Sequence, residues 1–136
     1  MGIYNKANTE SVATGAANVP ATLFSENVAG GSVGDGNALR FDFDFTYIGT
    51  ADLAVKLGTK QVYGANAEGR YELYVGRSGQ SNAVVWGVAY TASGVYRIPP
   101  QTVVGGLNWS QGQTFTAVGT ANSEGGLVLQ RAGLMK

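Results

Sequence analysis

The sequence predicts an all-β fold, and three observations carry this prediction. Charged residues make up 13 % of the 136 residues, about half of the usual share of roughly 25 %, and a helical bundle needs such residues on its exposed faces. Glycine is abundant, at 21 residues, which suits short strands joined by tight turns. Within the segment 38–47, apolar and polar residues alternate without interruption from Leu39 to Tyr47, as is typical of a strand with one buried face.

Eight strands are expected along the chain, separated by turn-forming residues. They are placed at residues 21–28, 38–47, 52–63, 70–77, 83–91, 95–104, 113–120 and 126–134. The third is expected to bend at Gly58. The segment 83–91 is apolar on both faces, which indicates a strand that is central in its sheet or covered by a partner. Pro99 and Pro100 cannot donate ladder hydrogen bonds, so the segment 95–104 is expected at an edge or as an irregular crossing. This many short strands predicts a sandwich or a barrel.

The domain organisation is predicted as an extended N-terminal arm, residues 1–18, followed by one β-domain, residues 19–136. The first 18 residues are small and polar and show little periodicity. Such a segment is either a frayed terminus or an arm that becomes ordered against a neighbouring subunit. The sequence leaves these two alternatives open.

The composition argues against several classes of function. The chain has neither Cys nor His, which excludes disulfides, thiolate catalysis, Ser–His–Asp triads and ordinary His metal ligands. Its formal net charge is +0 and its nine basic residues are scattered, so no nucleic-acid footprint is visible. No apolar run is long enough for a membrane span. We therefore expect a protein that is not an enzyme, requires no cofactor or metal, and binds neither nucleic acid nor membrane.

One pair of acidic residues and one single aspartate are candidate chemical sites. Asp42 and Asp44 lie on one face of a strand, about 7 Å apart, a separation that suits a glycosidase pair. The favoured interpretation is a solvated outer face whose charges discourage aggregation. Asp35 lies in a glycine-rich turn that lacks the closing Glu of a calcium loop, so an ordinary turn is expected there.

Aromatic residues supply the candidate contact surfaces. Trp86, Tyr90 and Tyr96 could form a platform for a sugar, but a core or subunit interface is favoured because Trp86 and Tyr90 share one face of an apolar strand. The interface residues predicted on this basis, together with apolar residues of the arm, are Ile3, Tyr4, Trp86, Val88 and Tyr90.

The order of seven segments carries a resemblance to a known family. They are residues 21–25 (ATLFS), 36–41 (GNALRF), 53–63 (LAVKLGTKQVY), 69–73 (GRYEL), 77–79 (RSG), 108–110 (NWS) and 127–131 (LVLQR). In this order, which covers about residues 21–135, the chain resembles small virion proteins of phages and viruses. The resemblance implies an eight-stranded antiparallel jelly-roll-like β-sandwich that is typically a homotrimer. It identifies no functional residue.

The function that this resemblance implies is structural. Members of the family either cap capsids as decoration (cement) proteins or form modules of tail fibres and spikes. The chain lacks a long shaft or collagen-like repeat, and this favours a phage capsid decoration protein at the capsid surface, bound to the major capsid protein of the same virion. The alternative is a receptor-binding or structural module of a tail fibre or spike that binds a host glycan. Pro99 and Pro100 depart from the family pattern.

Overall fold

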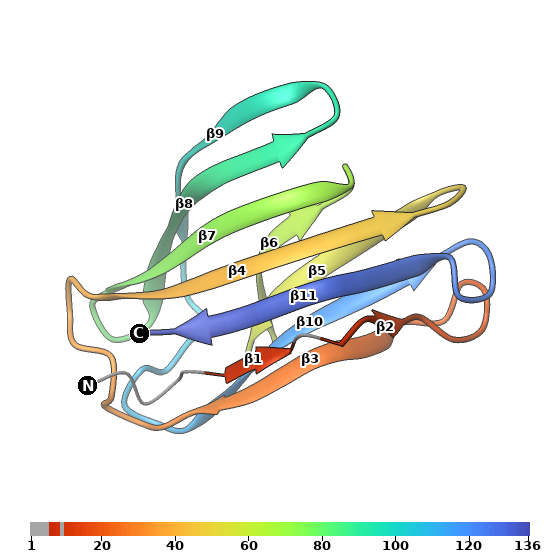
Figure 1. The fold of residues 1–136 in the computed structure, drawn as a ribbon. Helices are drawn as coiled ribbons and strands as arrows, with labels where there is room; N and C mark the ends of the chain where they lie inside the picture. Colours follow the sequence, from red (N-terminus) through yellow and green to blue (C-terminus); the bar gives the residue numbers. More distant parts are fainter. Residues whose placement is uncertain (1–5, 9) are drawn as a thin grey trace.

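The computed structural model describes residues 6–8 and 10–136, with side chains from Glu10 onward. This part of the chain is all-β, with eleven strands (Figure 1). The strands are β1 (Lys6–Asn8), β2 (Val12–Ala13), β3 (Ala21–Val28), β4 (Ala38–Tyr47), β5 (Ala51–Leu57), β6 (Lys60–Ala65), β7 (Gly69–Ser78), β8 (Asn82–Thr91), β9 (Gly94–Val103), β10 (Gln113–Ala121) and β11 (Leu127–Met135). Across the same residues, no helix is long and apolar enough to span a membrane.

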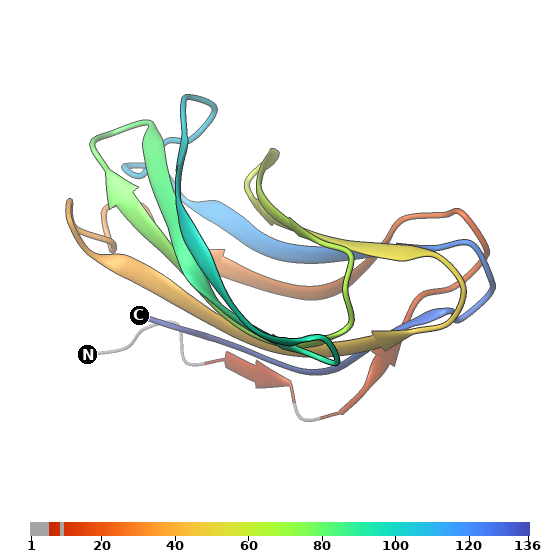
Figure 2. The same cartoon turned by 90° about the horizontal axis from the view of Figure 1, so that it is seen from above.

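The strands form two antiparallel sheets that lie against one another (Figure 2). The larger sheet has the order β1-β11-β4-β7-β8-β9, and β2 also pairs with β11. The smaller sheet has the order β3-β10-β5-β6. The larger sheet continues past β7 with two more strands, β8 and β9.

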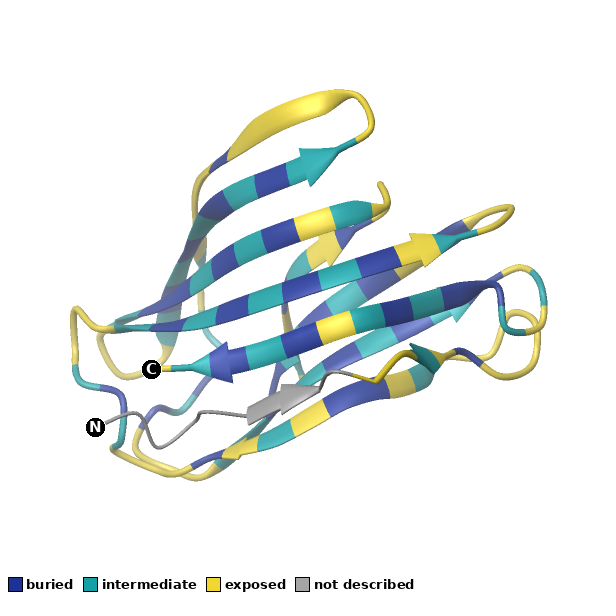
Figure 3. Ribbon diagram, in the orientation of Figure 1, coloured by how far each residue is buried: buried dark blue, intermediate teal, exposed yellow. Residues whose placement is uncertain are grey.

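The predicted alternation of β4 is confirmed, and it explains how the core forms. Leu39, Phe41, Phe43 and Phe45 are buried, with at most 2 % of each residue exposed. The same banding of buried and half-buried residues runs along the neighbouring strands (Figure 3). Side chains of period two on adjacent strands thus cover one continuous face, and removing this face from water stabilises the fold.

Phenylalanine rings join the two sheets across the core. The ring of Phe41 on β4 lies with its centroid 5.1 Å from that of Phe24 on β3. It lies 4.9 Å from that of Phe115 on β10, in an edge-to-face arrangement. Phe41 therefore joins the larger sheet to both the edge strand β3 and the central strand β10 of the smaller sheet.

The predicted strand 52–63 is two strands rather than one bent strand. Leu57 pairs with Lys60, and Gly58 between them has a φ of 63°, a left-handed conformation that glycine adopts at little cost. The chain therefore reverses at Gly58 into a hairpin of β5 and β6. Together with β1 and β2, this raises the strand count among the described residues from the expected eight to eleven.

The described part of the predicted arm packs on its own domain. β1 and β2 both pair with β11. Thr14 is only 4 % exposed, and its amide donates a hydrogen bond of 2.9 Å to the carbonyl of Leu127. Residues 1–5 and 9 lie outside the described residues, so contact of the arm with a neighbour stays a prediction for that part.

The position of the proline-containing strand is confirmed. β9 is the edge strand of the larger sheet, and β8 lies between β7 and β9. The pairing of β8 with β9 shifts in register between Val85 and Gly87, opposite Pro99 and Pro100. An edge strand has one side free of ladder bonds and tolerates a bulge there, which accommodates the two prolines.

Tyr71 makes the fold sensitive to alkaline pH. It is 3 % exposed, its hydroxyl donates a 2.6 Å hydrogen bond to the carbonyl of Ala67, and burial raises its pKa to about 12. The unfolded chain ionises this phenol at about pH 10. The contribution of the neutral phenol to stability is therefore complete below pH 10 and is lost as the pH rises to about 12, by roughly 2–3 kcal/mol. Urea unfolding measured over this pH range should show that the free energy of unfolding falls more steeply with pH for the wild type than for Tyr71→Phe. Equal pH dependence in the two proteins would contradict the raised pKa of Tyr71.

Candidate docking surface

The face of the larger sheet that points away from the core carries an unusual set of side chains. Along β8, Val84, Trp86, Val88 and Tyr90 are half-buried and alternate with fully buried residues. Since cross-strand neighbours share a face, the side chains of β7 and β4 on this face follow from the register. We call this surface the outer face, and its polar and aromatic members include Arg40, Asp42, Asp44, Arg70, Glu72, Tyr74, Trp86 and Tyr90.

A stacked aromatic pair lies at the middle of the outer face. Tyr74 on β7 is the direct cross-strand partner of Trp86 on β8. Their rings are nearly parallel, at 10°, with centroids 5.4 Å apart. A Cβ atom on Gly76 would lie 2.8 Å from Cζ3 of Trp86. The indole therefore lies along β7, over a position that only glycine leaves open.

Gly76→Ala is expected to displace the indole of Trp86 from its place over β7, because the new methyl group would occupy the space that the ring uses. NMR of the two indole N–H groups checks this. The signal of Trp86 should shift as its stacking on Tyr74 changes. The signal of Trp109 should stay, since that residue is 3 % exposed and its Nε1–H donates to the carbonyl of Asn82 at 2.8 Å. An unchanged Trp86 signal would contradict the packing described here.

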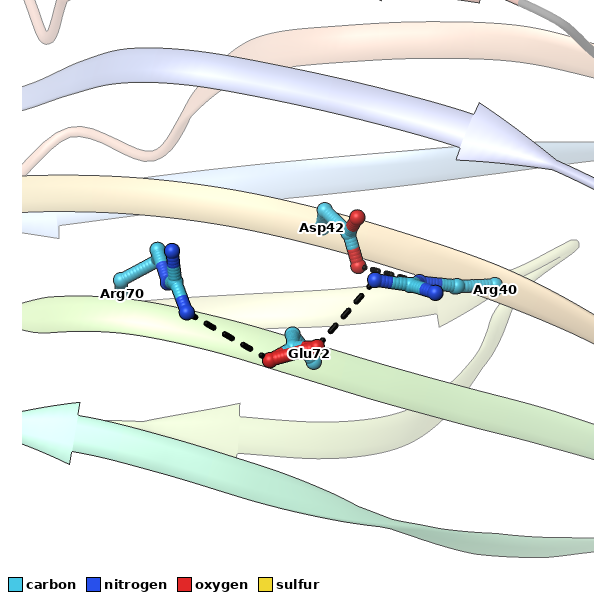
Figure 4. A network of polar contacts seen from close by, with 4 residues as sticks. All are labelled: Arg40, Asp42, Arg70 and Glu72. Atoms are coloured by element: carbon cyan, nitrogen blue, oxygen red, sulfur yellow. Dashed lines mark hydrogen bonds and ion pairs between the residues drawn. The ribbon is translucent and has the colours of Figure 1, made fainter. Parts of the chain in front are cut away.

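Alternating charges on β4 and β7 lie beside the aromatic pair, and Figure 4 shows the four charged side chains. Arg40 donates to Asp42 at 2.9 Å and to Glu72 at 3.1 Å. Arg70 lies 3.6 Å from the other carboxylate oxygen of Glu72. The hydrogen bond to Asp42 raises the pKa of Arg40. These partly exposed pairs contribute little to folding stability, and they place each guanidinium group beside a carboxylate.

The two arginines also connect the charges to the rings. The guanidinium carbon of Arg40 lies 5.7 Å from the ring centroid of Tyr74, and that of Arg70 lies 4.4 Å from the centroid of Tyr90. Arginine and aromatic residues on a half-buried surface are typical of protein–protein interfaces and of their energetically dominant residues. A hollow of about 380 Å³ adjoins these residues, between β4, β7 and β11.

The structure describes three of the five predicted interface residues, and these three lie on one face. Trp86, Val88 and Tyr90 share the outer face, as expected. Ile3 and Tyr4 lie outside the described residues. Tyr96 pairs with Ala89, which is 5 % exposed and belongs to the core, so its side chain lies on the opposite face. The three aromatic residues considered for a sugar platform therefore do not form one surface.

The acidic residues have contacts with their own domain. Asp42 accepts a hydrogen bond from Arg40, and Asp44 lies beside it at the hollow. Asp35 accepts from the amide of Gly79 at 2.8 Å, which joins its turn to the turn between β7 and β8. Among the residues that the structure describes, no three His, Cys, Asp or Glu side chains are grouped as a metal site would require.

The sequence reasoning did not identify Tyr74, Arg70 and Glu72 as part of the surface. A signal was present, because Arg70, Glu72 and Tyr74 alternate with the apolar residues of their strand. Their meeting with Arg40 depends on the pairing of β4 with β7, which are separated in the chain by the β5–β6 hairpin. Comparison of the chain with protein-family models, curated proteins and solved structures finds no match.

Proposed function

We propose that this protein is a phage capsid decoration protein that assembles as a homotrimer through the outer face and stabilises the shell by binding the major capsid protein. The observation that carries the proposal is the stacked pair of Tyr74 and Trp86, flanked by two arginines that are held over tyrosine rings. Aromatic rings and arginines of this kind contribute most to binding when another protein covers them and removes them from water. A protein that binds only the assembled shell stabilises it by mass action.

The strand order supports a jelly-roll fold for this module. In a jelly roll, strands taken in chain order lie as first–eighth–third–sixth in one sheet and second–seventh–fourth–fifth in the other. With β1 and β2 together as the first strand, the order β1-β11-β4-β7 follows the first pattern and β3-β10-β5-β6 follows the second. The hairpin of β8 and β9 is then an addition beside the sixth strand. Jelly rolls are frequent in viral capsids and in lectins, which agrees with the resemblance of the sequence to virion proteins.

Self-association through the outer face is supported by its charge pattern. Arg40 and Arg70 alternate with Asp42 and Glu72 across β4 and β7, so the surface carries both signs. A second copy can therefore meet it with opposite charges opposed, while the ring of Trp86 supplies apolar contact area. Closed symmetric assemblies are the usual form of homo-oligomers.

The first test is the mass of the protein in solution and its copy number in the particle. Light scattering should give three times the chain mass of 14.1 kDa, and quantitative mass spectrometry of purified virions should find hundreds of copies. A protein that stays monomeric at all concentrations and fails to bind mature shells would overturn the proposal.

A module of a tail fibre or spike is the second candidate. The observation that favours it is a cleft between the sheets that is lined by tyrosines. Copy number separates the two candidates, because a fibre or spike module is present in only a handful of copies for each particle.

A further inference from the structure

A second surface arises because the two sheets differ in width. β8 and β9 extend the larger sheet beyond β7, while the smaller sheet ends at β6. Part of the core-facing side of the β8–β9 hairpin faces β6, and a cleft of about 480 Å³ opens between them. We call it the inter-sheet cleft. Figure 2 shows the β8–β9 hairpin rising on one side and β6 on the other.

Three tyrosines line the inter-sheet cleft, each from a different strand. Tyr63 lies on β6, Tyr71 on β7 and Tyr96 on β9. The rings of Tyr63 and Tyr71 are inclined at 59°, with centroids 6.2 Å apart. Tyr71 is buried at the base, whereas 48 % of Tyr96 is exposed. The cleft therefore has an aromatic base and an aromatic rim.

The hydroxyl groups of the three tyrosines differ in their contacts. The hydroxyl of Tyr71 donates to Ala67 within the domain, and that of Tyr96 donates to the carbonyl of Ser93 at 3.1 Å. Within the described part of the chain, the half-buried Tyr63 makes no side-chain hydrogen bond. Its phenol is available to donate to a ligand, and burial raises its pKa.

Apart from Arg97, the polar residues that line the cleft are uncharged. The exposed amide of Gln101 lies on the core-facing side, because this residue pairs with Val85, and Thr91 adds a hydroxyl. The one charged residue at the cleft is Arg97, and it pairs with Val88, whose side chain lies on the outer face. Neutral donors and acceptors beside ring faces do not attract an ion, and they suit a ligand that is polar at its edges and apolar on its faces.

We propose that the inter-sheet cleft binds a neutral saccharide of two or three sugar units. A pyranose ring presents C–H groups on its faces, which pack on tyrosine rings, and hydroxyls at its edge, which can hydrogen-bond to Tyr63 and Gln101; the hydroxyl of Thr91 already donates to the carbonyl of Gly94. The cleft volume lies within the range of about 300–1,000 Å³ for small-molecule sites. The site is separate from the outer face, so it does not depend on the assembly proposed above.

Titration of the intact protein with neutral oligosaccharides, monitored by NMR, tests the proposal. The probes are maltotriose, cellotriose, chitotriose and mannotriose. At least one should bind with millimolar or tighter affinity and shift the amide signals of β6 and β9. Tyr96→Ala should weaken this binding about tenfold, because it removes the exposed ring. Tyr63→Phe should weaken it severalfold, because it removes only the hydroxyl.

Tyr90→Ala is the matched control, since Tyr90 lies on the adjacent strand but on the outer face. It should leave saccharide affinity within twofold of the wild type. Absence of binding by all four probes would overturn the proposal, and so would equal losses in Tyr96→Ala and Tyr90→Ala. Oligomeric state is measured on the same samples: a trimer that binds no saccharide removes this proposal alone, while a monomer that binds one removes the proposed assembly alone.

Discussion

Replacing Phe41 with alanine is expected to lower the free energy of unfolding by about 3–5 kcal/mol. Phe41 is fully buried, and its ring contacts Phe24 and Phe115 of the smaller sheet as well as Phe43 on its own strand. Truncation leaves a cavity where the two sheets meet, and rings fixed on three other strand positions cannot all move to fill it. Domains of this size have a total stability of about 5–15 kcal/mol, so the variant should be close to unfolding.

Urea unfolding followed by circular dichroism measures this loss. The control is Ile48→Ala, which also shortens a large apolar residue but at a position that is 68 % exposed. That change should alter stability by at most about 0.5 kcal/mol. Both variants are measured at the same protein concentration, because assembly would add to the apparent stability. A loss below about 1 kcal/mol for Phe41→Ala would contradict the two-sheet core.

The features that the sequence predicted well are those that depend on neighbouring residues. Alternation in β4 identified the buried face because successive side chains of a strand point to opposite sides. Pro99 and Pro100 indicated an edge strand because proline lacks the ladder donor. Trp86, Val88 and Tyr90 share a face for the same local reason. Each of these conclusions required only a short window of sequence.

The features that were missed depend on turns and on distant pairing. A single turn at Gly58 divides one predicted strand into two. Thr91 pairs with Gly94, so two residues form the turn between β8 and β9, and this places Tyr96 opposite the buried Ala89. A turn longer by one residue would have placed Tyr96 on the outer face with Tyr90. Turn length, which composition does not determine, thus decided which aromatic residues share a surface.

The strand order was likewise inaccessible from local patterns. Of the strands expected from alternation, two form the β8–β9 hairpin beyond β7, and the strands that pair with the far side of β11 are β1 and β2 in the polar N-terminal segment. Short strands with small polar residues give little periodic signal. They form because β11 presents an edge with which Val12 and Ala13 pair.

Trp86→Ala is expected to convert the proposed trimer to a folded monomer. Truncation of a central tryptophan of an interface typically costs 2 kcal/mol or more, at least about 30-fold in affinity, at each contact where it is buried. Trp86 fits this role because its indole is held flat against Tyr74, at the middle of the outer face between the arginine-bearing strands and the edge. Light scattering over a range of protein concentrations measures the shift in the association equilibrium.

Tyr96→Ala is the matched control for assembly, since Tyr96 lies on the other side of the same sheet. It should remain trimeric, while Trp86→Ala should not. Circular dichroism separates dissociation from unfolding: Trp86 is half-buried on the surface and the core beneath it is intact, so the spectrum of the monomer should match that of the wild type. A Trp86→Ala variant that assembles as tightly as the wild type would show that copies meet through another surface. In that case the aromatic outer face would be free to contact the shell directly, and loss of shell binding by the trimeric Trp86→Ala variant would locate the contact there.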